Sequence, residues 1–140
     1  MKEVELYLAI EEALNYVSLI SEEELRPLVS LDRERRQKKR RLAGETVYLG
    51  DDQKIRRKDI TDIKCRIIIK RIKETVGCCK CNERHIACLE FHHKEPEEKL
   101  FQVSAFRNHC SNITKLIREI NKCLLICANC HKKEHYHGAF

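Results

Sequence analysis

The sequence has little glycine and little proline, with four and two residues among its 140. This scarcity disfavours a glycine-rich β architecture and favours helix. No apolar run reaches the roughly 18 residues that a membrane-spanning helix requires, so we expect no membrane partner. The opening stretch, MKEVELYLAIEE, carries acidic side chains within its apolar residues, which argues against a secretory signal peptide. These absences predict a cytoplasmic protein. Its length of 140 residues is about that of one domain plus an extension.

Cysteine, by contrast, is abundant. The chain has nine cysteines, an odd number, and no secretory signal is expected. Thiols or metal ligands are therefore favoured over disulfide bonds, and the compartment is predicted to be reducing. A metal site would also add stability to the one modest core that a chain of this length can bury.

Charge is distributed unevenly. Residues 1–32 carry two basic and eight acidic side chains, whereas residues 33–140 carry 26 basic and 14 acidic ones. A basic body predicts a polyanionic partner such as nucleic acid, although a merely charged surface would give the same balance. The densest run can be a solvated helix face or flexible arm, or a phosphate-contacting segment, because each neutralised phosphate releases counterions. Its basic members are Arg33, Arg35, Arg36, Lys38, Lys39, Arg40 and Arg41.

Apolar spacing predicts several helices. Residues 3–20 have apolar side chains at steps of three or four, and a second helix is expected to begin after Ser21, whose spacing to Glu24 is that of a capping box. Pro27 could shift its start, and the helix is expected to end near Gly44. A turn or short hairpin is predicted over 45–58, followed by a helix over 59–76, for which the β-branched residues also allow a strand.

Two C-x-x-C pairs stand 45 residues apart, Cys78 with Cys81 and Cys127 with Cys130. Zinc prefers four thiolate or imidazole ligands in a tetrahedron, and a tight C-x-x-C turn supplies two of them. The pairs therefore predict one structural Zn²⁺ site, rather than a redox motif, which would open a helix in a βαβ unit. Cys79 lacks the two-residue gap to Cys81. The remaining thiols, at positions 65, 88, 110 and 123, are expected to be buried apolar side chains.

Four histidines form two pairs near these cysteines. His92 and His93 follow a segment that can form a strand, where neighbouring side chains point to opposite sides. His131 and His135 are four positions apart, so a helix would direct both imidazoles toward one cation. Each pair could be a solvated surface feature by itself. Their combination with the cysteine pairs predicts a metal-dependent site.

The order of these motifs resembles that of the HNH endonucleases, and specifically of their zinc-stapled C-x-x-C subgroup. The resemblance covers about residues 64–137 and rests on the segments 77–81, 89–94, 119–120 and 127–135, with Pro96 and Lys99 between them. It implies an α+β chain, mainly helical, with a C-terminal ββα-metal domain of treble-clef type. We thus expect an N-terminal helical extension over 1–58 and a nuclease domain over 59–140.

The resemblance also implies residue roles. His93 would be the general base, while His92 and His131 would bind a catalytic Mg²⁺ or Mn²⁺, with His135 a third ligand or a phosphate contact. An imidazole suits the activation of water, and a divalent cation can neutralise charge on the phosphate and help the 3′ oxygen leave. The family's middle Asn falls at Lys122 here, so Asn121 is predicted to orient His93. Asn129 lies inside the second cysteine turn.

A last helix is expected over 113–123 with Ser111 as its cap and an apolar stripe facing the core. Together with the basic body, the resemblance implies an endonuclease that hydrolyses double-stranded DNA. The main alternative is a non-catalytic zinc-binding, nucleic-acid-binding treble-clef module, which would not need all four histidines. A third hypothesis is an interaction adaptor that binds a protein partner, or dimerises, through the acidic N-terminal helix.

Overall fold

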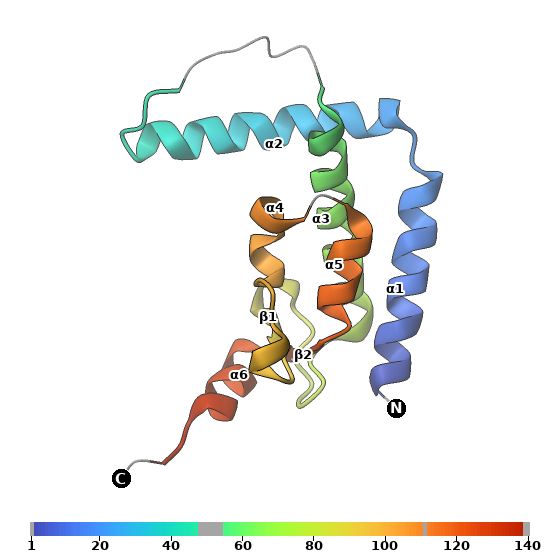
Figure 1. Ribbon diagram of the computed structural model, residues 1–140, viewed down its shortest axis with the longest axis vertical. Helices are drawn as coiled ribbons and strands as arrows, with labels where there is room; N and C mark the ends of the chain where they lie inside the picture. Colours follow the sequence, from blue (N-terminus) through green and yellow to red (C-terminus); the bar gives the residue numbers. More distant parts are fainter. Residues whose placement is uncertain (1, 48–54, 111, 139–140) are drawn as a thin grey trace.

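The computed structural model describes residues 2–47, 55–110 and 112–138. Within them the chain forms six α-helices and one antiparallel pair of short strands, an α+β arrangement that is mostly helical (Figure 1). None of the described helices has the length and apolar character to cross a membrane.

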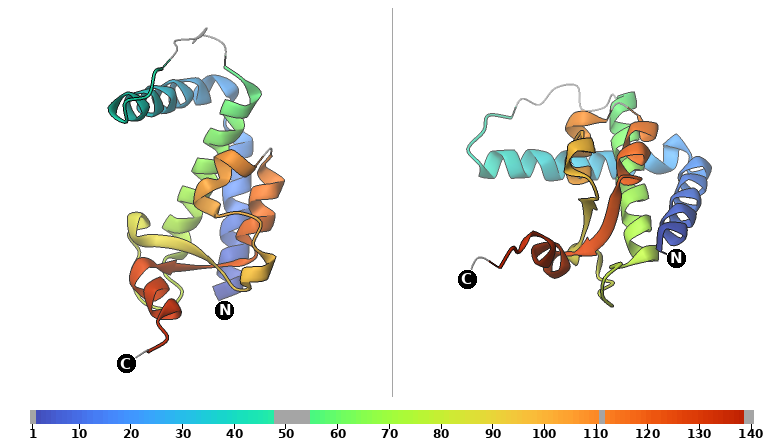
Figure 2. Two further views of the ribbon diagram at one scale, coloured as in Figure 1. Left: turned by 60° about the vertical axis from the view of Figure 1, so that its left-hand side comes forward. Right: turned by 60° about the horizontal axis from the view of Figure 1, so that its bottom comes forward.

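Helices α1 (Lys2–Leu19) and α3 (Arg57–Val76) lie side by side, as Figures 1 and 2 show. The apolar stripe predicted for the first helix faces α3: Ile10, Ala13 and Val17 are each at most 3% exposed. These side chains belong to the same core as those of α3 and the sheet. The first helix of the predicted N-terminal extension thus contributes side chains to the main core.

Helix α2 (Glu22–Leu42) begins where the sequence predicts. Ser21 is its N-cap, the Ser21 side chain accepts from the backbone N–H of Glu24, and the Glu24 side chain accepts from that of Ser21. Pro27 lies inside the helix and does not shift its start. Leu25 and Val29 pack with two isoleucines of α3 in a second, smaller core. The C-terminal half of α2 extends away from the body (Figure 1).

The sheet consists of β1 (Leu89–His93) and β2 (Cys123–Cys127), paired antiparallel with Leu89 opposite Cys127 and His93 opposite Cys123. Helix α6 (Ala128–His135) follows β2 directly and contacts both strands. Between the strands lie the short helices α4 (Phe106–His109) and α5 (Ile113–Ile120) and two single 3-10 turns. The result is an antiparallel pair of strands followed directly by a helix. Cysteine and histidine side chains converge where these elements meet.

The structure differs from the sequence-based predictions at one helix and at one cysteine. The helix predicted over 113–123 ends at Ile120, because residues 123–127 pair with β1 instead; its N-cap is Asn112, and Ser111 lies outside the described residues. Cys88 is exposed rather than buried, whereas the thiols at 65, 110 and 123 are buried as expected. Half of the turn predicted over 45–58, residues 48–54, lies outside the described residues, and the helix that follows it is confirmed.

Candidate metal centres

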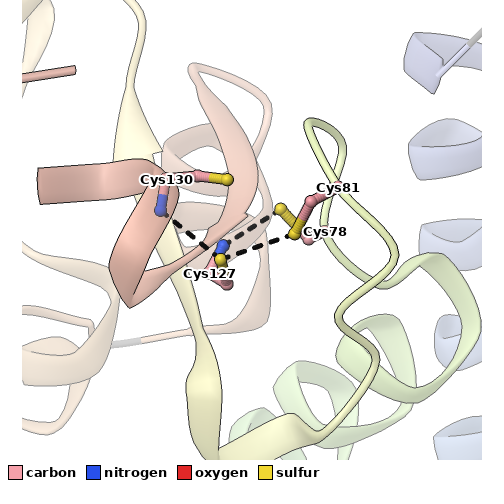
Figure 3. Close-up of side chains that lie close together, drawn as sticks. All are labelled: Cys78, Cys81, Cys127 and Cys130. Carbon is pink, nitrogen blue, oxygen red and sulfur yellow. Dashed lines mark hydrogen bonds between the residues drawn. The ribbon is translucent and has the colours of Figure 1, made fainter. Parts of the chain in front are cut away.

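The four predicted cysteine ligands meet at one point. Their sulfur atoms all lie within 4.8 Å of one another, and the Sγ atoms of Cys81 and Cys127 are 3.6 Å apart. Four thiolates around one zinc at about 2.3 Å would be separated by about 3.8 Å. Figure 3 shows the two sources of this four-cysteine cluster: the loop after α3 carries Cys78 and Cys81, and the junction of β2 with α6 carries Cys127 and Cys130. The cluster therefore has the composition and spacing of a zinc site.

Backbone N–H groups donate to the sulfurs of Cys78, Cys81 and Cys127, as they do toward thiolates. Cys78 Sγ accepts from the N–H of Cys127 at 3.2 Å and from that of Lys80 at 3.4 Å. Burial opposes ionisation of Cys78, but these hydrogen bonds lower its pKa to about 6. Cys127 is also the N-cap of α6, where its sulfur accepts from the N–H of Cys130. A metal held here would fix the first turn of α6 against the loop after α3.

A second cluster, of three histidines, lies beside the first. One ring nitrogen of each of His92, His131 and His135 comes within 4.8 Å of the others. His92 is on β1, and the other two occupy successive turns of α6 on the same helix face, as their i,i+4 spacing predicts. The Nε2 atoms of His131 and His135 are 3.1 Å apart. Two imidazole ligands of one cation would be separated by about 2.9–3.4 Å.

Glu90 orients this cluster. Its carboxylate lies 2.5 Å from His131 Nδ1, so that nitrogen donates and the lone pair of His131 falls on Nε2, facing His135. Such a carboxylate–imidazole pair is the usual support of a metal-binding histidine. Burial, and then the neighbouring His131 and His135, lower the pKa of His92 and favour the neutral ring that binds metals.

His93 points to the other side of β1, as the alternation of a strand requires. It is 7% exposed, and its Nε2 lies 2.7 Å from Glu119 Oε1. Glu119 belongs to α5 and is only 1% exposed. The two histidines of β1 therefore have different surroundings: His92 joins the histidine cluster, and His93 joins a buried carboxylate.

Both histidines nevertheless line one cavity of about 380 Å³, which is large enough for a phosphodiester group and water. The histidines of α6 line it too, together with Lys99 and with Lys73 of α3. Burial lowers the pKa of Lys73 from its ordinary value, although Glu90 opposes this effect. The cavity thus combines a cluster of potential metal ligands, a separate imidazole and two lysines able to contact an anion.

Among the hydrogen bonds of the described residues, none joins Asn121 to His93. His93 is instead hydrogen-bonded to Glu119, and Asn121 forms the C-cap of α5, where its backbone N–H donates to the carbonyl oxygen of Ile117. Lys122, the next residue, donates to Glu119 Oε2 at 2.9 Å. The side-chain contact predicted for Asn121 is therefore made by Glu119.

The basic run of α2 divides into two groups. Arg33 pairs with Asp59 at 2.8 Å and Arg36 with Asp32 at 3.0 Å, both carboxylates being less than a tenth exposed. Arg40 pairs with the exposed Glu45. The other members, Arg35, Lys38, Lys39 and Arg41, are exposed along the part of α2 that extends from the body.

Glu90 and Glu119 are two residues of the site for which the sequence predicted no role. Strand alternation could have placed Glu90 on the face of His92, two positions away. Glu119 stands three positions after Leu116, within the apolar stripe of its helix, and a carboxylate on a buried face is a signal of a specific partner. The sequence contains nothing that identifies His93 as that partner.

Comparison with known proteins adds no assignment: no family model, curated protein or solved structure matches the chain.

Proposed function

We propose that this protein is a metal-dependent endonuclease of the HNH type, which hydrolyses DNA phosphodiester bonds. One observation carries the proposal: His92, His131 and His135 come together in the cavity that His93 also lines, and the helix that carries two of them begins at the four-cysteine cluster. A non-catalytic zinc module has no need of this second cluster. The succession of β1, β2 and α6 is also the order of elements in a ββα-metal nuclease.

The four-cysteine cluster would hold a structural zinc, and the three histidines a catalytic divalent cation. Imidazole ligands suit Mn²⁺ and later transition metals, whereas Mg²⁺ prefers carboxylate and water oxygens. The donor set therefore fits Mn²⁺ better than Mg²⁺. When bound, this cation would neutralise charge on the phosphate and stabilise the departing 3′ oxygen. Three protein ligands leave positions open for phosphate and water.

His93 would act as the general base. It faces the cavity but stands outside the histidine cluster, so it remains available to take a proton from water. The oxygen of that water forms a bond to phosphorus, the bond from phosphorus to the 3′ oxygen breaks, and that oxygen is finally protonated by solvent. Lys73 and Lys99 would contact the phosphate from the cavity wall.

The exposed part of the basic run would contact DNA away from the cut. In all the views of Figures 1 and 2, the C-terminal end of α2 and helix α6 extend to the same side of the molecule. A duplex on this side would meet four exposed cations: Arg35, Lys38, Lys39 and Arg41. Arg33 and Arg36 would instead anchor the helix to α3 through Asp59 and Asp32.

The test is cleavage of supercoiled plasmid with EDTA, Mg²⁺ or Mn²⁺. We expect no cleavage with EDTA and the greatest cleavage with Mn²⁺. His93→Ala should lower the rate by roughly 10²–10⁴-fold, the usual contribution of a positioned general base, without changing DNA binding. Substitution of the exposed His137, outside the cluster, is the matched control. Tight DNA binding without cleavage under any condition would favour the zinc-binding regulator instead.

A further inference from the structure

Glu119 is a carboxylate enclosed by donors. Its Oε1 accepts from the backbone N–H of Leu100 at 2.9 Å and of Phe101 at 3.4 Å, and its Oε2 accepts from Lys122 Nζ at 2.9 Å. The group is 1% exposed, so these contacts take the place of water. Burial would raise its pKa, but the hydrogen bonds from Lys122, Leu100 and His93 lower it to about 2. Glu119 therefore stays ionised and can only accept hydrogen bonds.

An ionised partner settles the tautomer of the ring that faces it. His93 Nε2 lies 2.7 Å from Glu119 Oε1, and two acceptors at this distance would repel, so Nε2 must carry the hydrogen. In the neutral ring the lone pair then falls on Nδ1. Among the described residues nothing hydrogen-bonds to Nδ1, and it is not one of the buried polar atoms without a partner. Nδ1 is therefore the ring nitrogen left to accept from a water, and His93 lines the cavity in which such a water would lie.

We propose that Glu119 is the positioning residue of this site: it holds His93 in the Nε2–H tautomer and thereby makes Nδ1 the atom that takes the proton from water. The inference rests on the proposed function and adds to it the identity of the base atom and of the group that selects it. Nδ1 receives one proton as the water oxygen bonds to phosphorus, and Nε2 keeps its hydrogen bond to Glu119 throughout. Glu119 itself neither gains nor loses a proton.

The arrangement also fixes the ring's orientation. Glu119 is tied to the chain segment 100–101 and to Lys122, so its carboxylate cannot follow the ring if the ring turns. A 180° flip of His93 would place a carbon against Oε1 and forfeit a charge-assisted hydrogen bond. Neighbouring His92 points to the opposite side of β1 and is subject to no such constraint.

The test is long-range ¹H–¹⁵N NMR of histidine-labelled, zinc-loaded protein without a second cation, at about pH 8, above the usual titration range of histidine. We expect a protonated Nε2 and an unprotonated Nδ1 for His93. Glu119→Gln offers an amide that can donate as well as accept, so the spectrum should move toward a mixture of tautomers. The kcat for plasmid should fall by roughly 10–100-fold with KM unchanged, the usual cost of losing such a supporting contact.

Lys122→Met is the matched control, because it removes another hydrogen-bond partner of Glu119 and leaves the contact of Glu119 with His93 in place. In this variant the tautomer of His93 should be the same as in the wild type. If Glu119→Gln does not fold, the wild-type spectrum still decides. A wild-type His93 with its hydrogen on Nδ1 overturns the inference, even if the protein cuts DNA. The expected tautomer in a protein that never cuts DNA overturns the proposed function alone.

Discussion

His131 Nε2 and His135 Nε2 face each other across 3.1 Å on successive turns of α6. Because the Nδ1–H of His131 donates a hydrogen bond to Glu90, the lone pair of the neutral ring lies on Nε2, the nitrogen that faces His135. A cation between the two rings would use both lone pairs, with His92 as a third donor.

This relationship predicts the behaviour of the second metal site. His135→Ala should weaken Mn²⁺ binding by at least about 10-fold, and Glu90→Gln by roughly 10–100-fold, because the supporting carboxylate is lost. Titration of Mn²⁺ followed by electron paramagnetic resonance measures both constants. His85→Ala removes an exposed histidine outside the cluster and should leave binding unchanged. Equal affinity in all four proteins would exclude a site at these histidines.

The four-cysteine cluster should retain about one zinc through purification, as structural sites of this type do. Cys127→Ser should lose that zinc and unfold at a lower temperature, because metal binding is coupled to folding. Elemental analysis and circular dichroism would test this. Cys88→Ser is the matched control, since Cys88 is exposed and outside the cluster. If the wild-type protein is folded and contains no zinc, the proposal of a structural zinc at this cluster is wrong.

The two groups of basic residues on α2 should respond differently to substitution. Changing Arg35, Lys38, Lys39 and Arg41 together to Gln should reduce the log–log salt slope of DNA binding by up to about 3–4, with little change in stability. Arg33→Gln with Arg36→Gln should instead lower stability, because it leaves Asp59 and Asp32 buried with fewer partners. Fluorescence anisotropy at several salt concentrations gives the slope. If the fourfold variant has the same slope as the wild type, these four side chains are merely solvated and do not contact DNA.

We expect the ionised Asp59 side chain to make a pH-dependent contribution to the stability of the folded protein. Burial opposes its ionisation, but hydrogen bonds from Arg56 and Arg33 lower its pKa to about 2 from 3.8. A lowered pKa in the folded state stabilises the protein above the unfolded value near 3.8, and this contribution is lost as pH falls toward 2. It amounts to about 2 kcal/mol at neutral pH.

Asp59→Asn should therefore be less stable than the wild type by at least this amount in urea at neutral pH, and the difference should shrink between about pH 4 and pH 2. Comparison at each pH cancels effects common to both proteins, such as zinc release. Glu45→Gln, at an exposed ion pair with Arg40, should differ little from the wild type at any pH. A difference for Asp59→Asn that is constant with pH would contradict the assigned pKa.

Local signals explain why much of the fold could be predicted. The capping box at Ser21 and the apolar stripe of α1 act within a few residues, so they specify where helices begin and which face is buried. The cysteine pairs and the His131–His135 spacing act in the same way. By contrast, the helix predicted over 113–123 runs into the start of β2, because this strand depends on pairing with β1, some 30 residues earlier. No local pattern specifies that partner.

The candidate site likewise combines features that depend on local sequence with contacts between residues far apart in the chain. Its metal-ligand types and spacings are local, and the structure brings these residues together. The contact of His93 with Glu119 spans 26 residues and depends on how α5 packs against the sheet. The acidic residues of α1 also have partners distant in sequence: Glu12 pairs with Arg71, and Glu3 with Lys94. These pairs partly neutralise the N-terminal acidic surface that charge counting suggested for a partner.

Residues 127–135 contain two thiols of the first cluster and two imidazoles of the second. The helix that presents the imidazoles therefore starts at the point where zinc would hold the chain. Oxidants and thiol-alkylating reagents, which take sulfur away from zinc, would release this helix. In the proposed enzyme, such agents would abolish cleavage although no cysteine takes part in the chemistry, which would make activity dependent on the redox state of the surroundings.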